Sequence, residues 1–178
     1  MKERFGDQIQ IERRAFPLRP GPDRSAQFRG TKREATWRHI KAAIEPEGIA
    51  WNIWEREDYP NWSLPALEAA RCAGLQGEAE MEEMHFRLFR GFFEQGVNIA
   101  NTDEVLGLAR DSGLNYGRFL DDFDSGVTRR AVLDDYEEAI NTYMVYAIPT
   151  VIFPNEERVV GAVPIEEYVK VLEKLGVS

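Results

Sequence analysis

The stretch Tyr146–Phe153, Tyr-Ala-Ile-Pro-Thr-Val-Ile-Phe, most constrains how this chain can fold. From Thr150 onward it is a short apolar run with β-branched residues, which predicts a buried strand. A proline directly before such a strand is unusual, because it removes a backbone donor from the ladder. The sequence therefore predicts a strand that begins directly after Pro149, a residue that cannot donate a backbone hydrogen bond.

The residues that follow predict a second strand and a helix. Pro154-Asn155 has the composition of a tight turn, Arg158–Val160 can return antiparallel, and Gly161 can end that strand. A helix to Leu175 then has Pro164 in its first turn. Its apolar residues recur at helical spacing: Ile165, Tyr168, Val169 and Leu172. The whole is a strand–turn–strand–helix unit.

This unit resembles the carboxyl-terminal half of a DsbA-type thioredoxin-like domain, the group that includes FrnE-like oxidoreductases and 2-hydroxychromene-2-carboxylate isomerases. The matching phrases are Ile148-Pro149-Thr150-Val151 and Val160-Gly161-Ala162. The resemblance implies an α/β, thioredoxin-like fold and a cis peptide bond before Pro149. It also implies that Pro149 and the flanking backbone of Ile148 and Thr150 bind an extended thiol substrate.

Two more phrases extend the resemblance. Phe16-Pro17-Leu18-Arg19-Pro20 ends a predicted strand over Gln8–Phe16, and Pro60-Asn61-Trp62-Ser63 opens a predicted helix. In glutathione-using relatives an asparagine near this point holds the peptide. Asn61 is therefore a candidate binding residue, although a turn or capping role is the simpler interpretation. On this alignment the family's first strand, its Cys-x-x-Cys motif and most of its first helix have no counterpart in the chain.

Between these phrases the sequence is helical. We expect one thioredoxin-like domain over residues 1–178, with a helical insertion over about residues 34–145. Apolar spacing with Gly and Pro at the ends predicts helices over 34–44, 66–73, 78–94, 105–110, 115–123 and 128–146. The methionine and phenylalanine stripe of helix 78–94 is expected to be core. The tryptophan-rich stretch 49–62 is predicted to be a loop whose rings either form the wall of a substrate groove or cap the helices.

Cys72 is the only cysteine, so the chain has neither an internal disulfide nor a Cys-x-x-Cys motif. A buried, inert thiol is the default interpretation of Cys72. A catalytic pair with His85 is the alternative, because such a pair needs only proximity in the fold. Cys72, His39 and His85 have no metal-ligand spacing.

Composition limits the partners. The formal net charge of −9 argues against nucleic acid and anionic membranes. No apolar run approaches the roughly 20 residues of a membrane span. The first residues lack the apolar core of a signal peptide, which favours a cytoplasmic location.

Gly161-Ala162-Val163 stands where the isomerase branch usually has Gly-Ser-Asp, so the resemblance favours the oxidoreductase branch. We expect a thiol–disulfide oxidoreductase of DsbA or FrnE-like type, redox-inactive as it stands. A glutathione-dependent isomerase-like enzyme and a non-catalytic binding or assembly protein are the alternatives. The expected partner is a thiol- or disulfide-bearing peptide or small molecule, with glutathione the one candidate cofactor.

The missing first strand of the family would leave two inner strand edges unpaired. Open edges beside an apolar face are templates for pairing another chain, which predicts a homo-oligomer. Direct pairing of Gln8–Phe16 with Thr150–Phe153, or loss of the strand to disorder, are the alternatives.

Overall fold

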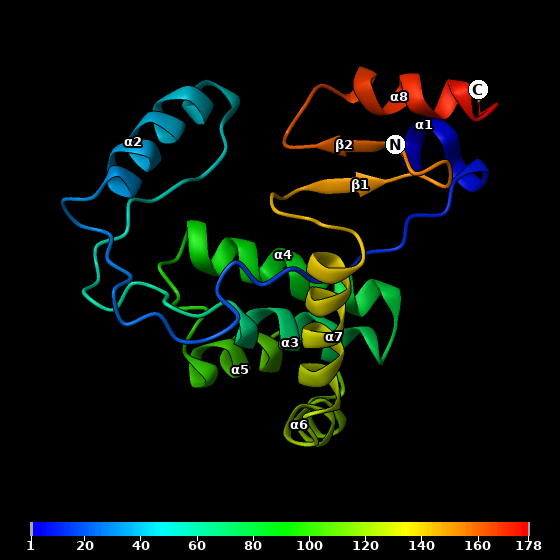
Figure 1. Ribbon diagram of the computed structural model, residues 1–178. Coiled ribbons are helices and arrows are strands. Elements are labelled where there is room, and N and C mark those ends of the chain that lie inside the picture. The colour runs from blue at the N-terminus through cyan, green and yellow to red at the C-terminus, as the bar shows by residue number, and fades with distance from the viewer. Residues whose placement is uncertain (1, 178) are drawn as a thin grey trace. The chain divides into compact units, whose positions relative to one another are not determined.

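The computed structural model describes residues 2–177, with side chains from residue 4 onward. The chain divides into two compact units (Figure 1). Unit 1 comprises Met1–Phe16 and Asp135–Ser178, and unit 2 comprises Pro17–Asp134. Helix α7 (Val127–Asn141) begins in unit 2 and ends in unit 1.

Unit 1 is organised around a two-stranded antiparallel sheet. β1 (Thr150–Ile152) pairs with β2 (Arg158–Val160) in the register Thr150↔Val160. Helix α8 (Ile165–Lys174) follows the hairpin, which confirms the predicted strand–turn–strand–helix unit (Figure 1). Its core joins residues of the hairpin, α8 and the short α1 (Lys2–Phe5), namely Phe5, Phe153, Val169, Val171 and Leu172.

The predicted strand over Gln8–Phe16 is wrong. Gln8 ends the short 3-10 helix η1 (Gly6–Gln8), and residues 9–16 have no regular secondary structure. Ile9 packs against the core of unit 1, but Ile11 is 48 % exposed. The alternation of these residues does not make a strand, because no strand of the described residues supplies a ladder beside them.

A buried carboxylate holds the end of this segment instead. Ala15 N–H donates to Oδ2 of Asp135 at 3.0 Å, and Nη1 of Arg14 donates to Oδ1 at 2.9 Å. The ring of Phe16 then packs edge-on against Tyr136, with centroids 5.1 Å apart. Side-chain contacts to α7 therefore replace the strand pairing that the sequence pattern suggested.

Unit 2 is helical, and its helices lie within a few residues of their predicted positions. They are α2 (Lys32–Ile44), η2 (Glu45–Glu47), α3 (Leu64–Gly74), α4 (Glu78–Phe93), α5 (Thr102–Arg110), α6 (Tyr116–Asp124) and the first part of α7. α7 was expected to reach Tyr146 but ends at Asn141. The tryptophan-rich stretch has no regular secondary structure, as predicted.

The main core of unit 2 lies among α3, α4, α5 and α6. Its fully buried residues include Ala69, Cys72, Met84, Val105 and Phe119. The prediction for the stripe on α4 is only half right. Met84 and Leu88 are buried, but two phenylalanines of the same stripe, Phe86 and Phe89, are 52 % and 50 % exposed.

The starts of α3 and α5 differ in their capping. The side chain of Asn101 caps α5 by accepting from the N–H groups of Asp103 and Glu104. Ser63 stands at the start of α3, but its hydroxyl makes no capping bond and accepts from Arg19 N–H at 3.1 Å. The hydroxyl of Ser63 therefore links the start of α3 to the loop that contains Arg19 instead of capping the helix.

Across residues 2–177, we find no helix with the length and apolar character that crossing a membrane requires.

Candidate functional site

Pro149 enters β1 directly, and the Ile148–Pro149 peptide bond is cis. The carbonyl of Pro149 accepts from Gly161 N–H at 2.7 Å, and Phe153 N–H donates to the carbonyl of Glu157 at 3.0 Å. These two bonds close the ends of the β1–β2 ladder. The ladder therefore fixes which main-chain groups of β1 face β2.

The other edge of β1 is open. In an antiparallel strand the N–H and C=O groups of successive residues point alternately to opposite edges. Because Pro149 and Phe153 bond towards β2, the main-chain groups of Thr150 and Ile152 point away from it. No other strand of residues 2–177 pairs with them. We call these outward groups of Thr150 and Ile152 the β1 edge.

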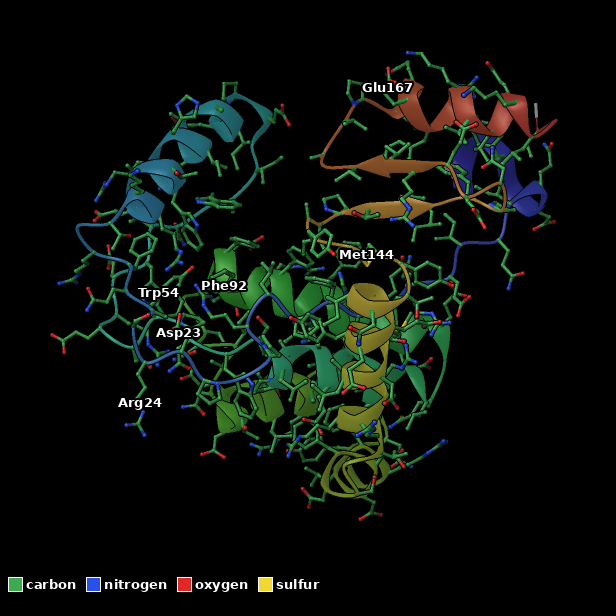
Figure 2. The ribbon with its side chains drawn as sticks, in the orientation of Figure 1. Asp23, Arg24, Trp54, Phe92, Met144 and Glu167 are labelled. Carbon is green, nitrogen blue, oxygen red and sulfur yellow. The ribbon has the colours of Figure 1, made fainter. Side chains whose placement is uncertain are left out.

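The segment that leads from α7 into β1 is apolar and exposed. Met144, labelled in Figure 2, has a positive φ of 52° and is 54 % exposed. Tyr146 is 76 % exposed and Ile148 42 % exposed, and Val151 in β1 is 38 % exposed. The hydroxyl of Thr150 donates to the carbonyl of Ala147 at 2.6 Å, which braces the entry to the strand. The β1 edge therefore lies beside exposed apolar side chains of unit 1.

Cys72 has the environment of a structural thiol. It lies in α3 with no exposed surface, and its Sγ donates to the carbonyl of Phe119 at 3.2 Å. Burial raises the pKa of Cys72 to about 12, and the negative charges of Asp122 and Glu68 add to the rise. His85, its conceivable partner, is exposed on α4 with its ring 5.0 Å from that of Phe89.

Asn61 has a structural contact within unit 2. Its carbonyl accepts from Asp23 N–H at 2.9 Å, which, with the Ser63–Arg19 bonds, joins the start of α3 to the preceding loop. The candidate residues Ile148, Pro149 and Thr150 therefore lie together in unit 1, whereas Asn61 and Cys72 belong to unit 2. Among the described residues, no group of His, Cys, Asp and Glu side chains could hold a metal ion.

One buried charge was missed by sequence reasoning. Glu68 in α3 is 1 % exposed, and its Oε2 accepts from Nε of Arg129 at 3.0 Å. Burial raises the pKa of Glu68, and the hydrogen bond from Arg129 opposes that rise. Its other oxygen, Oε1, is buried without a hydrogen-bond partner in the described part of the chain. Nothing in the local sequence marks it, because its partner is 61 residues away.

The model of the DSBA-like thioredoxin domain family matches residues 1–173. The chain belongs to this family. Membership in the DSBA-like family confirms the α/β, thioredoxin-like fold with a helix-rich insertion that the sequence resemblance predicted.

Two individual proteins are similar to this DSBA-like domain. YwbO of Bacillus subtilis (strain 168), whose function is uncharacterised, is 28 % identical over 153 residues, which are 83 % of this chain and 73 % of YwbO. A crystal structure from Nitrosomonas europaea, provisionally named as a protein disulfide isomerase, matches with a TM-score of 0.68. That match has 17 % identity and covers 87 % of this chain and 78 % of the other, and at this identity it shows the fold alone.

Proposed function

We propose that this DSBA-like domain binds an extended thiol- or disulfide-bearing peptide at the β1 edge, beside Pro149. The observation that supports the proposal is the set of outward main-chain groups of Thr150 and Ile152, which have no strand partner among residues 2–177. A peptide strand added there would make the bonds of a further ladder. The resemblance adds the main chain of Ile148 as the next contact along the peptide.

In this proposal the chain with the printed sequence binds such peptides but does not catalyse dithiol–disulfide exchange. Exchange needs a thiolate that attacks the disulfide and a second thiol that resolves the mixed disulfide. Cys72 is the only cysteine, and its pKa of about 12 leaves almost no thiolate at neutral pH. Cys72 is therefore assigned to the core of unit 2 and not to the chemistry.

Binding at the β1 edge is tested by two substitutions of one residue. Thr150→Pro removes the outward N–H, whereas the β1–β2 bonds from Gly161 and Phe153 remain. Thr150→Ala removes only the side-chain bond to Ala147. We expect Thr150→Pro to weaken binding of a labelled, thiol-blocked insulin B chain about fivefold, because one hydrogen bond contributes about 1 kcal/mol. Thr150→Ala should bind like the parent, and equal loss in both variants would contradict the proposal.

Catalytic inactivity is tested by an insulin-reduction assay with dithiothreitol. We expect the chain, its Cys72→Ala variant and buffer alone to give the same rate of insulin precipitation. The variant is the matched control, because it removes the only thiol of the chain. Turnover by the chain that disappears in Cys72→Ala would show that this single thiol is redox-active.

A further inference from the structure

A second cluster of buried side chains in unit 2 consists of aromatic rings. Phe28, Trp37 and Trp54 are buried in it, and rings from the tryptophan-rich loop and the end of α4 pack against them. Trp54 and Phe92, both labelled in Figure 2, have ring centroids 5.6 Å apart. Trp51 stacks on Phe93 with centroids 4.2 Å apart. The tryptophan-rich loop is therefore held in place by ring contacts rather than by regular secondary structure.

Part of this cluster lines a hollow. Its volume is about 380 Å³, and Trp37, Trp51, Tyr59, Phe92 and Phe93 line it together with Leu18 and two arginines. This volume is at the small end of the range for ligand pockets. We call this feature the aromatic hollow. Its lining residues include two cations, Arg19 and Arg33, and no carboxylate.

The two arginines differ in how fully they are neutralised. Nε of Arg19 lies 3.6 Å from a carboxylate oxygen of Asp23, a long ion pair. The guanidinium of Arg33 lies over the ring of Tyr59, 4.9 Å from its centroid, and donates to the carbonyl of Gln27. No carboxylate among the described residues forms an ion pair with Arg33. In a chain with a net charge of −9, the hollow thus has an uncompensated positive charge.

One of the rings that line the hollow has a buried donor. Nε1 of Trp51, a lining residue, is buried and has no acceptor among residues 4–177. Buried polar groups in folded proteins are nearly always hydrogen-bonded, so this N–H is an exception that calls for a partner. This nitrogen has almost no accessible surface, so a ligand in the hollow would contact the rings and not this N–H.

We propose that the aromatic hollow is a docking site for an acidic polypeptide segment in which an aromatic residue stands next to Asp or Glu. The aromatic side chain packs among the rings, and the carboxylate pairs with Arg33. A polypeptide fits better than a free small molecule, because Leu18 beside the hollow is 69 % exposed and offers apolar contact to flanking residues. Aromatic and arginine side chains are also the residue types that dominate binding energy at protein interfaces.

This docking site goes beyond the proposed function. The aromatic hollow belongs to unit 2 and the β1 edge to unit 1, so the two sites can be inactivated separately. Thr150→Pro should leave binding at the hollow unchanged, and Arg33→Glu should leave binding of a neutral peptide at the β1 edge unchanged.

The test is an array of immobilised pentapeptides probed with the labelled full chain. The central residue is Phe, Tyr, Leu or Ala, and its neighbours are Asp, Asn or Lys. We expect aromatic centres flanked by Asp to bind best. Arg33→Gln should reduce the preference for Asp over Asn about fivefold, the factor typical of a partly exposed ion pair. Arg33→Glu should shift the preference to Lys, and rescue by Arg33→Lys should restore the preference for Asp.

Arg38→Glu is the matched control. Arg38 lies in the same helix, α2, is exposed, and pairs with Glu34 rather than lining the hollow. It should leave the ranking of peptides unchanged. Trp51→Ala removes one of the lining rings and should weaken all aromatic-centred acidic peptides without changing the preference for Asp over Asn. Circular dichroism melting of each variant establishes that it is folded.

Three outcomes would overturn the proposal. The first is an array in which aromatic centres bind no better than Ala. The second is an unchanged ranking in Arg33→Glu, which would mean that Arg33 does not select the peptide, or the same change in Arg38→Glu, which would assign the selectivity to net charge. The third is phenylacetate binding as tightly as the best peptide, which would make the hollow a small-molecule site.

Discussion

Units 1 and 2 differ in how completely they enclose their apolar side chains. The main core of unit 2 is a cluster of ten buried residues from helices on several sides, and Met84, Val105 and Phe119 have no exposed surface. The core of unit 1 is a cluster of five buried residues. Tyr146 and Val151 remain exposed beside its sheet. The comparison shows that the larger buried core lies in unit 2, whereas unit 1 has a strand edge that no other strand of residues 2–177 pairs with.

The physical reason is the size of the sheet in unit 1. Two strands of three residues each are marginal as an isolated hairpin and depend on helices packed beside them. Buried residues of α8 and Phe5 of α1 provide that support. The same scarcity of strands leaves the outward main-chain groups of Thr150 and Ile152 without a strand partner among residues 2–177, and the proposed peptide binding depends on these groups.

The largest expected effect on stability comes from a cavity in the core of unit 2, and it tests whether that core is the better packed of the two. Phe119→Ala should lower the free energy of unfolding by about 3–5 kcal/mol, because the ring is fully buried and its removal leaves a cavity. Phe89→Ala is the control in the same unit, since that ring is 50 % exposed. Urea unfolding followed by circular dichroism measures both. Similar losses in the two variants would mean that the core among α3, α4 and α6 is not tightly packed.

A smaller effect is expected from the buried charge of unit 2. Burial raises the pKa of Glu68, so the folded state holds this proton more tightly than the unfolded state does. The contribution of Glu68 to the free energy of unfolding is therefore most favourable below the unfolded carboxyl pKa of about 4.3 and is lost as pH rises through the folded pKa of Glu68. Glu68→Gln keeps an acceptor for Arg129 and removes the charge. It should therefore stabilise the chain at pH 7 by about 1 kcal/mol.

The pH profile separates this cause from a packing effect. The gain in Glu68→Gln should shrink as pH falls towards 4, where the parent carboxyl becomes protonated and neutral. Glu47→Gln, at an exposed position, is the control and should change stability little at either pH. A constant gain at all pH values would mean that the charge of Glu68 is not what limits stability.

The local parts of the fold could be predicted from the sequence, and the non-local parts could not. The β-branched run at Thr150 predicted β1, and the turn and Gly161 around Arg158–Val160 predicted β2, because a hairpin depends on neighbours in sequence. The prediction that the first strand is buried was wrong, since no residue of β1 is buried and Val151 is 38 % exposed. The strand over Gln8–Phe16 failed because a strand needs a partner. Its last residues instead bind Asp135, which is 120 residues away from Ala15.

The candidate sites show the same limit. Pro149 could be found from the sequence, because the resemblance rests on contiguous residues. The open edge required the register of β1 and β2, which no single segment contains. Helical spacing on α4 marked two apolar rows but could not say that Met84 would be covered and Phe86 exposed. The pairing of Arg33 with Tyr59 in the aromatic hollow likewise joins residues from separate segments.

The last prediction compares the same substitution in the two units. Val105→Ala removes two methyl groups from a fully buried site in α5 and should cost about 2 kcal/mol, from roughly 0.8 kcal/mol per buried methylene plus a cavity contribution. Val151→Ala removes the same groups from a side chain that is 38 % exposed. It should cost less than about 1 kcal/mol, mostly from lower β propensity. Urea unfolding of both variants measures these costs. If the two costs are equal, and the cost of Val151→Ala rises with protein concentration, a second copy of the chain covers β1, as the expected homo-oligomer requires.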